Sequence, residues 1–89
     1  MKQEFKKQAL GHLRKAEGML KKVIDMVEND AYCMDIMQQS FAAQGFMKSA
    51  DRAIFENHLN TCFKEGMESK NSQRKRKLIL EMVRILDKV

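Results

Sequence analysis

The segment from Ala31 to Gly66 contains no signal that would end a helix, although the whole chain has only 89 residues and no proline. Apolar and small residues recur along this segment at steps of three and four, as they do on one face of an α-helix. They are Ile36, Ser40, Ala43, Met47, Ala50 and Ile54. At 1.5 Å per residue such a helix spans roughly 50 Å, which exceeds the width of a small domain. We therefore expect other copies of the chain to cover its apolar faces.

A second helical pattern precedes this segment, over residues 3–29. Its apolar stripe consists of Leu13, Ala16, Leu20, Val23 and Val27. Asn29 or Asp30 is expected to cap the helix that follows. After a polar connection at residues 69–73, a short last helix carries Ile79, Met82, Val83, Leu86 and Val89 on one face. The predicted fold class is all-α, with a single domain over residues 1–89 that has two long helices and a short C-terminal helix.

The chain is basic, with 17 Lys and Arg against 12 Asp and Glu and a formal net charge of +5. This excess suits a polyanionic partner, either nucleic acid or an anionic membrane, and it also suits a merely basic surface. No apolar run approaches the roughly 20 residues of a membrane span, and the N-terminus lacks the apolar segment of a secretory signal. We expect a cytoplasmic protein whose two cysteines are reduced.

Three residues of metal-ligating type form a pattern. His58 and Cys62 are four residues apart, which places both side chains on one face of a helix. Cys33 lies 29 residues before Cys62 on the same predicted helix, a separation of roughly 43 Å. The two cysteines therefore cannot share an ion within one protomer, but an antiparallel two-fold dimer would bring Cys33 of one chain to the partner's His58 and the partner's Cys62, twice over.

Two thiolates and one imidazole suit Cu(I) or Zn(II), and a set of three without a fourth ligand favours Cu(I). The alternative is that Cys33 and Cys62 are small buried apolar residues, because a single H-x-x-x-C spacing is a weak signal. His12 has no cysteine or acidic partner at helical spacing and is left out of the site.

The stretches Asn29–Gln39, Glu56–Cys62 and Leu13–Gly18 resemble the CsoR family of copper-sensing repressors. The resemblance implies a three-helix protomer that forms an antiparallel four-helix-bundle homodimer and a dimer-of-dimers homotetramer. It also implies an inter-subunit Cu(I) site formed by Cys33, His58 and Cys62. Tyr32 and Glu81 would match the family's pair that links the metal to DNA release.

The ligand set distinguishes the branches of this family. Formaldehyde and nickel/cobalt sensors lack a cysteine at the position of Cys62, and persulfide sensors lack the histidine, so the set here is of the copper type. Double-stranded operator DNA is the implied partner. The residues expected to contact it are Arg14, Lys15, Lys21, Lys22, Lys48 and Arg52. The chain departs from the family at His12, Met19 and Lys22, where an arginine, a polar residue and a glycine are common.

These features predict a copper(I)-responsive transcriptional repressor that binds operator DNA without metal and dissociates when Cu(I) binds. The alternatives are a sensor of persulfide, formaldehyde or Zn on the same fold, a copper buffer that does not bind DNA, and a purely structural helical oligomer. An enzyme is not expected, because the sequence offers no nucleophile with a base, no phosphate loop and no paired carboxylates.

Overall fold

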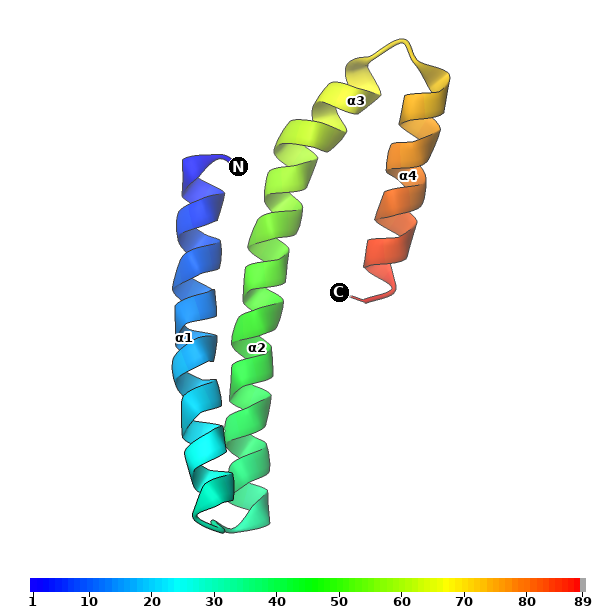
Figure 1. Cartoon of the computed structure of the whole chain (residues 1–89). Coiled ribbons are helices and arrows are strands. Elements are labelled where there is room, and N and C mark those ends of the chain that lie inside the picture. The colour runs from blue at the N-terminus through cyan, green and yellow to red at the C-terminus, as the bar shows by residue number, and fades with distance from the viewer. Residues whose placement is uncertain (89) are drawn as a thin grey trace.

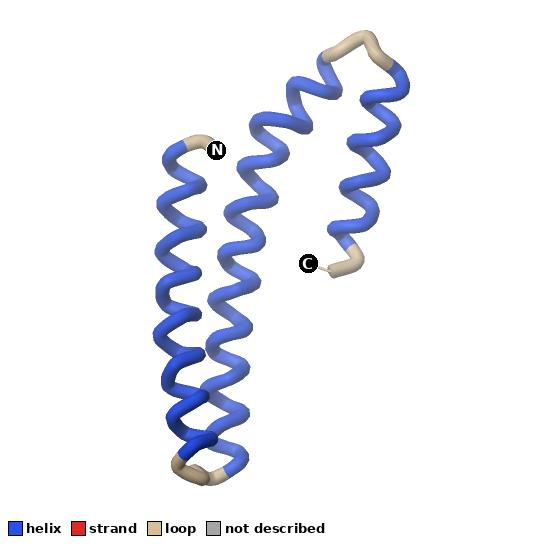
Figure 2. The backbone as a smooth tube through the Cα atoms, in the orientation of Figure 1, coloured by secondary structure: helices blue, strands red, loops and turns tan. Residues whose placement is uncertain are grey.

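The computed structural model describes residues 1–88, which consist of helices and short turns without a β-strand. Helix α1 (Gln3–Glu28) and helix α2 (Cys33–His58) lie side by side and antiparallel (Figure 1). Helix α2 continues through a π-helical turn, η1 (Leu59–Phe63), into α3 (Lys64–Glu68). Helix α4 (Ser72–Leu86) then folds back along the upper half of α2 (Figure 2). The expected all-α class and both long helices are confirmed.

Small side chains hold α1 and α2 together. Ala9 and Ala16 of α1 are buried, as are Ala50 and Ala53 of α2, and Phe5, near the start of α1, is buried as well. Short side chains at these positions allow the two helix backbones to approach closely and leave little room for bulky core residues. The hairpin is therefore narrow, and most of its larger apolar side chains lie on its surface, outside the contact between the two helices.

The turn between the two long helices differs from the expected one. Neither Asn29 nor Asp30 caps α2, which begins at Cys33 after Tyr32. Asn29 instead ends α1, where its side-chain amide donates a 2.8 Å hydrogen bond to the carbonyl oxygen of Asp25. Asp30 adopts a positive φ of 53°, a left-handed conformation in which Asp and Asn are enriched among non-glycine residues.

The last helix begins earlier than expected, at Ser72, because Asn71 caps it. The side-chain oxygen of Asn71 accepts a 3.1 Å hydrogen bond from the backbone N–H of Arg74. Leu78 of α4 packs on Gly66 of α3, and both residues are buried. This contact fixes where the polar connection folds back. Val89, expected on the apolar face of α4, lies outside the described residues.

The protomer exposes more surface than a compact monomer of its size. Its accessible area is 7080 Å², against about 5400 Å² for a folded monomer of 10.4 kDa. Its radius of gyration is 17.6 Å, where a compact chain of this length has about 12 Å. The exposed large apolar residues include Leu20, Val27, Phe41, Met47, Ile54, Val83 and Leu86. An isolated protomer thus leaves much of its apolar surface in water.

Among residues 1–88, no helix combines the length and the apolar character needed to cross a bilayer.

Candidate functional site

Helix α2 begins at Cys33 and ends at His58, and these two residues share one face of the helix. They are 25 residues apart, which at 3.6 residues per turn brings them within about 20° of seven full turns. The same face carries Ser40, Gln44, Met47, Asp51 and Ile54 between them. We call these seven residues the open face of α2, because α1 and α4 flank it without covering it.

Two grooves border the open face. Ser40, Gln44 and Met47 line a groove between α2 and α1 whose other wall contains Leu13, Leu20 and Val23. The apolar stripes expected on the two long helices therefore meet at this groove. Met47 keeps 46% of its surface exposed, so the stripes do not form a closed core within one protomer.

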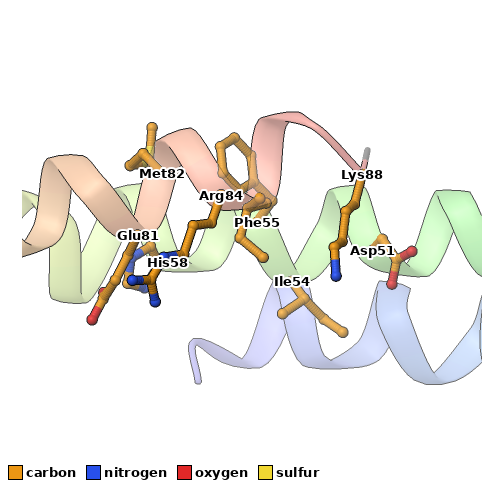
Figure 3. A pocket seen from close by; sticks show the side chains of 9 residues that line it. Asp51, Ile54, Phe55, His58, Glu81, Met82, Arg84 and Lys88 are labelled. Carbon is orange, nitrogen blue, oxygen red and sulfur yellow. The ribbon is translucent and has the colours of Figure 1, made fainter.

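The second groove lies between α2 and α4 and has a volume of about 600 Å³. Asp51, Ile54, Phe55 and His58 form one wall, and Glu81, Met82, Arg84, Ile85 and Lys88 form the other. Figure 3 shows His58, Glu81 and Arg84 at one end of this groove and Asp51 and Lys88 at the other. The half-buried imidazole of His58 thus faces a mainly apolar space with charged groups at its rim.

Directly after His58, the helix changes from α to π geometry over Leu59–Phe63. Two side chains stabilise this turn by donating to backbone carbonyls four residues earlier, Asn60 Nδ2 to Glu56 O and Thr61 Oγ1 to Asn57 O, each at 2.7 Å. A π-helical turn holds more residues than an α-helical turn and often marks a functional site. The angular offset between His58 and Cys62 therefore differs from that of a regular helix.

The donor set fits a soft metal ion. Cys33 and Cys62 are both free thiols and both exposed, and no hydrogen bond ties the imidazole of His58 to another described side chain. Thiolates and imidazole are the ligands that Cu(I) and Zn(II) accept. Within one chain, residues 1–88 hold no group of three His, Cys, Asp or Glu side chains placed to share an ion. The three residues can therefore form one site only if two chains contribute.

Tyr32 and Glu81 lie far apart in the protomer. Tyr32 directly precedes α2, beside Cys33, and its side chain is 70% exposed. Glu81 is half-buried on α4 and lines the groove that contains His58. The structure thus brings Glu81 and His58 to one groove from separate helices and leaves Tyr32 with Cys33.

All six residues expected to contact DNA are exposed. Arg14 and Lys21 are seven residues apart on α1, as are Lys15 and Lys22, so each pair lies on one face of the helix. Lys48 and Arg52 are four apart on α2. The ammonium of Lys15 lies 5.6 Å from the centre of the Phe46 ring, a contact that links α1 to α2.

His12 is remote from the three candidate ligands. Its ring stacks on Phe46 of α2, with 6.4 Å between ring centres and 27° between their planes. Its Nδ1 atom is buried and has no hydrogen-bond partner among the described atoms. His12 therefore contributes to packing between α1 and α2 and does not extend the metal site.

Sequence reasoning did not single out Asn57, the buried polar residue directly before His58. Its side-chain oxygen accepts a 2.8 Å hydrogen bond from the backbone N–H of Lys2, which precedes α1. A signal was present, because Asn57 follows the buried Ala50 and Ala53 at helical spacing. An asparagine at the end of a buried stripe needs a partner, which here is the start of another helix.

Residues 5–88 match a family model described as a metal-sensitive transcriptional repressor. The copper-sensing transcriptional repressor CsoR of Mycobacterium ulcerans is 47% identical over 58 residues, which cover 65% of this chain and 50% of that protein. CsoR of Bacillus subtilis is 36% identical over 64 residues, 72% of this chain and 63% of that protein. The copper-sensing transcriptional repressor RicR of Mycobacterium tuberculosis is 32% identical over 50 residues, 56% of this chain and 52% of that protein. The matches thus span between half and two thirds of these relatives.

Proposed function

The chain belongs to the family of metal-sensitive transcriptional repressors, and we propose that it is a cytosolic repressor that responds to Cu(I). Without metal it binds operator DNA and blocks transcription. With Cu(I) bound, its affinity for DNA falls and transcription begins. It acts through binding alone, without catalysing a reaction.

The observation that carries this proposal is the position of Cys33 and His58 at the two ends of the open face of α2. An antiparallel two-fold axis through the middle of this face, near Gln44 and Met47, brings Cys33 of one chain to the partner's His58. The partner's Cys62 lies about one turn beyond. The same axis repeats the arrangement at the other end, so each dimer contains two equivalent sites.

The excess surface of the protomer supports such an assembly. Its 7080 Å² exceeds the area of a compact monomer by about 1700 Å², roughly twice the area of about 800 Å² that each partner buries in a standard protein interface. Two hairpins that pack through the open face form an antiparallel four-helix bundle and cover the groove between α1 and α2. The exposed apolar residues of α4, Ile79, Val83 and Leu86, remain for a dimer of dimers.

Cu(I), when bound, supplies coordination bonds that join thiolates and an imidazole from two chains. For this the chain presents Cys33 and Cys62 as thiolates and His58 as a neutral ring. The ring nitrogen of His58 that does not bind metal would donate its N–H, and Glu81, which lines the same groove, would accept it. The two-fold axis also brings Tyr32, beside Cys33, to the partner's Glu81.

The basic residues of α1 and α2 supply the contacts to DNA phosphates, which account for most of the affinity. Binding of Cu(I) fixes the end of α2 in one chain against the start of α2 in its partner and favours a shape of the assembly that fits DNA less well. The coupling free energy between two such sites is typically about 1–3 kcal/mol.

The test is a DNA-binding titration with and without Cu(I), under anaerobic reducing conditions, using a duplex that carries the promoter of the chain's own gene. We expect tight binding without metal and a loss of affinity with Cu(I), but not with Zn(II). Tight Cu(I) binding without DNA binding would identify a copper buffer instead. If the chain binds neither Cu(I) nor DNA, it is a structural oligomer.

A further inference from the structure

Asn57 connects α1 to the end of α2, directly before the candidate metal ligand His58. It is the only polar residue among the buried side chains of residues 1–88, with 8% of its surface exposed. Its Oδ1 atom accepts the hydrogen bond from Lys2 N–H at 2.8 Å, across 55 residues of sequence. No side chain caps the start of α1 locally, so α2 satisfies a backbone donor that the helix end leaves free.

The backbone of the same residue belongs to the ligand segment. Its carbonyl oxygen accepts the 2.7 Å hydrogen bond from Thr61 Oγ1, inside η1 and one residue before Cys62. Its peptide bond joins it to His58. Any movement of the backbone between His58 and Cys62 therefore acts on Asn57 directly.

We infer that Asn57 is a positioning residue that transmits metal binding at His58 and Cys62 to α1; this inference rests on the proposed function. When the backbone at residues 57–62 shifts, the buried hydrogen bond to Lys2 either breaks, leaving its donor and acceptor poorly satisfied, or pulls the start of α1 with it. Following the shift is the less costly response. Because α1 is one helix of 26 residues, a displacement at Lys2 also moves the basic residues that we propose to contact DNA.

This role differs from that of a metal ligand or a DNA contact. Asn57 is covered by the helix pair, so it meets neither the ion nor the duplex. Removal of the Asn57 side chain should therefore leave the Cu(I) affinity and the metal-free DNA affinity nearly unchanged. It should change only the factor by which copper lowers the DNA affinity. Substitution of a residue with a purely structural role would lower the stability, or both the Cu(I) and the DNA affinity, and would leave the copper-dependent ratio unchanged.

The experiment compares Asn57→Ala with two matched variants. Asn57→Asp keeps an oxygen that accepts from Lys2 N–H, beside a helix N-terminus where a negative charge is favourable. Asn71→Ala removes a hydrogen bond of the same kind outside the ligand turn, because the side-chain oxygen of Asn71 accepts from the backbone N–H of Arg74 at the start of α4. Cu(I) affinity is measured by competition with a chelator, and DNA affinity by anisotropy of the promoter duplex with and without Cu(I).

In the wild type we expect copper to lower DNA affinity by roughly 5–150-fold, the usual range for coupled sites. Asn57→Ala should keep Cu(I) affinity and metal-free DNA affinity and lose most of this ratio, whereas Asn57→Asp and Asn71→Ala should retain it. A wild-type ratio in Asn57→Ala, or an equal loss in Asn71→Ala, overturns the inference. If copper does not release DNA from the wild type, the proposed function fails and the inference fails with it.

A second variant removes the same hydrogen bond from its donor side, in case Asn57→Ala does not fold. Lys2 has φ −65°, the angle that proline imposes, and proline has no N–H to donate. Lys2→Pro, in protein whose mass confirms that Met1 is retained, should therefore reduce the copper-dependent ratio as Asn57→Ala does. An unchanged ratio in Lys2→Pro would overturn the inference independently.

Discussion

His58 at the end of α2 and Glu81 on α4 line the same groove, although 23 residues and the fold-back after α3 separate them in sequence. A candidate metal ligand and a carboxylate that can bond to its ring thus come from different helices. We therefore expect the position of α4 to depend on what His58 binds, and α4 also has exposed apolar residues, among them Ile79, Val83 and Leu86.

The first prediction concerns this carboxylate. Glu81→Gln should retain Cu(I) binding within about 10–100-fold, because the residue lies outside the ligand set. It should reduce copper-dependent release of DNA, since the charged acceptor for the ring N–H of His58 is lost. Chelator competition and DNA anisotropy measure the two effects. Glu68→Gln, an exposed residue outside the groove, is the control and should behave as wild type.

The second prediction concerns the contact that holds α4 in place. A Cβ atom at Gly66 would collide with the side chain of Leu78, whereas one at Gly45 would meet no atom within 4 Å. Alanine is favoured over glycine in a helix by up to about 1 kcal/mol. Overpacking typically costs about 1–3 kcal/mol. Gly45→Ala should therefore raise the midpoint of thermal unfolding and Gly66→Ala should lower it; a higher midpoint for Gly66→Ala would show that Leu78 moves aside freely.

The long helices were predictable from sequence because their signals are local. A chain without proline and with apolar residues at steps of three and four specifies α1, and the helical run from α2 through α3, to within a few residues. The candidate ligands were also chosen from sequence, because few residues other than Cys and His bind a soft ion, and their binding of metal stays a prediction. The same pattern places Cys33 and His58 on one helical run, whereas the end of α2 at His58, where the π-helical turn begins, was not predicted.

The remaining features depend on competition between contacts that sequence spacing does not reveal. The π-helical turn forms where the side chains of Asn60 and Thr61 donate hydrogen bonds to backbone carbonyls. Asn and Thr can make the same bonds in a regular helix, so their presence in the sequence does not distinguish the two kinds of turn. The bond between Lys2 and Asn57 joins opposite parts of the chain. Helix α2 begins after Tyr32 without a side-chain cap, because the path of the turn, which local preference alone does not determine, sets its start.

The third prediction concerns assembly. At micromolar concentration the chain should sediment as a dimer or tetramer and not as a 10.4 kDa monomer, because the open face of α2 leaves Met47 and Ile54 exposed and borders a largely apolar groove that the protomer does not cover. Met47→Glu should dissociate the dimer, since it places two like charges near the proposed two-fold axis. Gln38→Glu adds the same charge elsewhere on α2 and should leave the assembly intact. A stable wild-type monomer would rule out the inter-subunit site.

The fourth prediction concerns DNA. Affinity should fall steeply with salt, because the contacts run from Lys and Arg to phosphates. Arg52→Ala should weaken binding and reduce the slope of log affinity against log salt by about one unit if this side chain neutralises one phosphate. Arg52 is exposed, so the fold should not change. An unchanged slope and affinity would exclude Arg52 from the interface.

The last prediction separates the ligands from the switch. Cys33→Ala should abolish tight Cu(I) binding, because the site loses one of two thiolates and no longer joins two chains. It should still bind DNA without metal, since Cys33 lies at the start of α2 and is not one of the basic residues. In cells the result is repression that copper does not relieve.

His58→Ala should behave differently, because it keeps both thiolates and these can hold Cu(I) in a two-coordinate site. Considerable affinity should therefore survive, while the contact that distinguishes the two shapes of the assembly is lost. A ligand that binds both states with equal affinity does not shift the equilibrium between them, however tightly it binds. His58→Ala should thus bind copper and release DNA poorly when both properties are measured on one preparation. Release equal to wild type would mean that the sulfur atoms alone carry the coupling and that the imidazole, although it faces the groove with Glu81, takes no part in it.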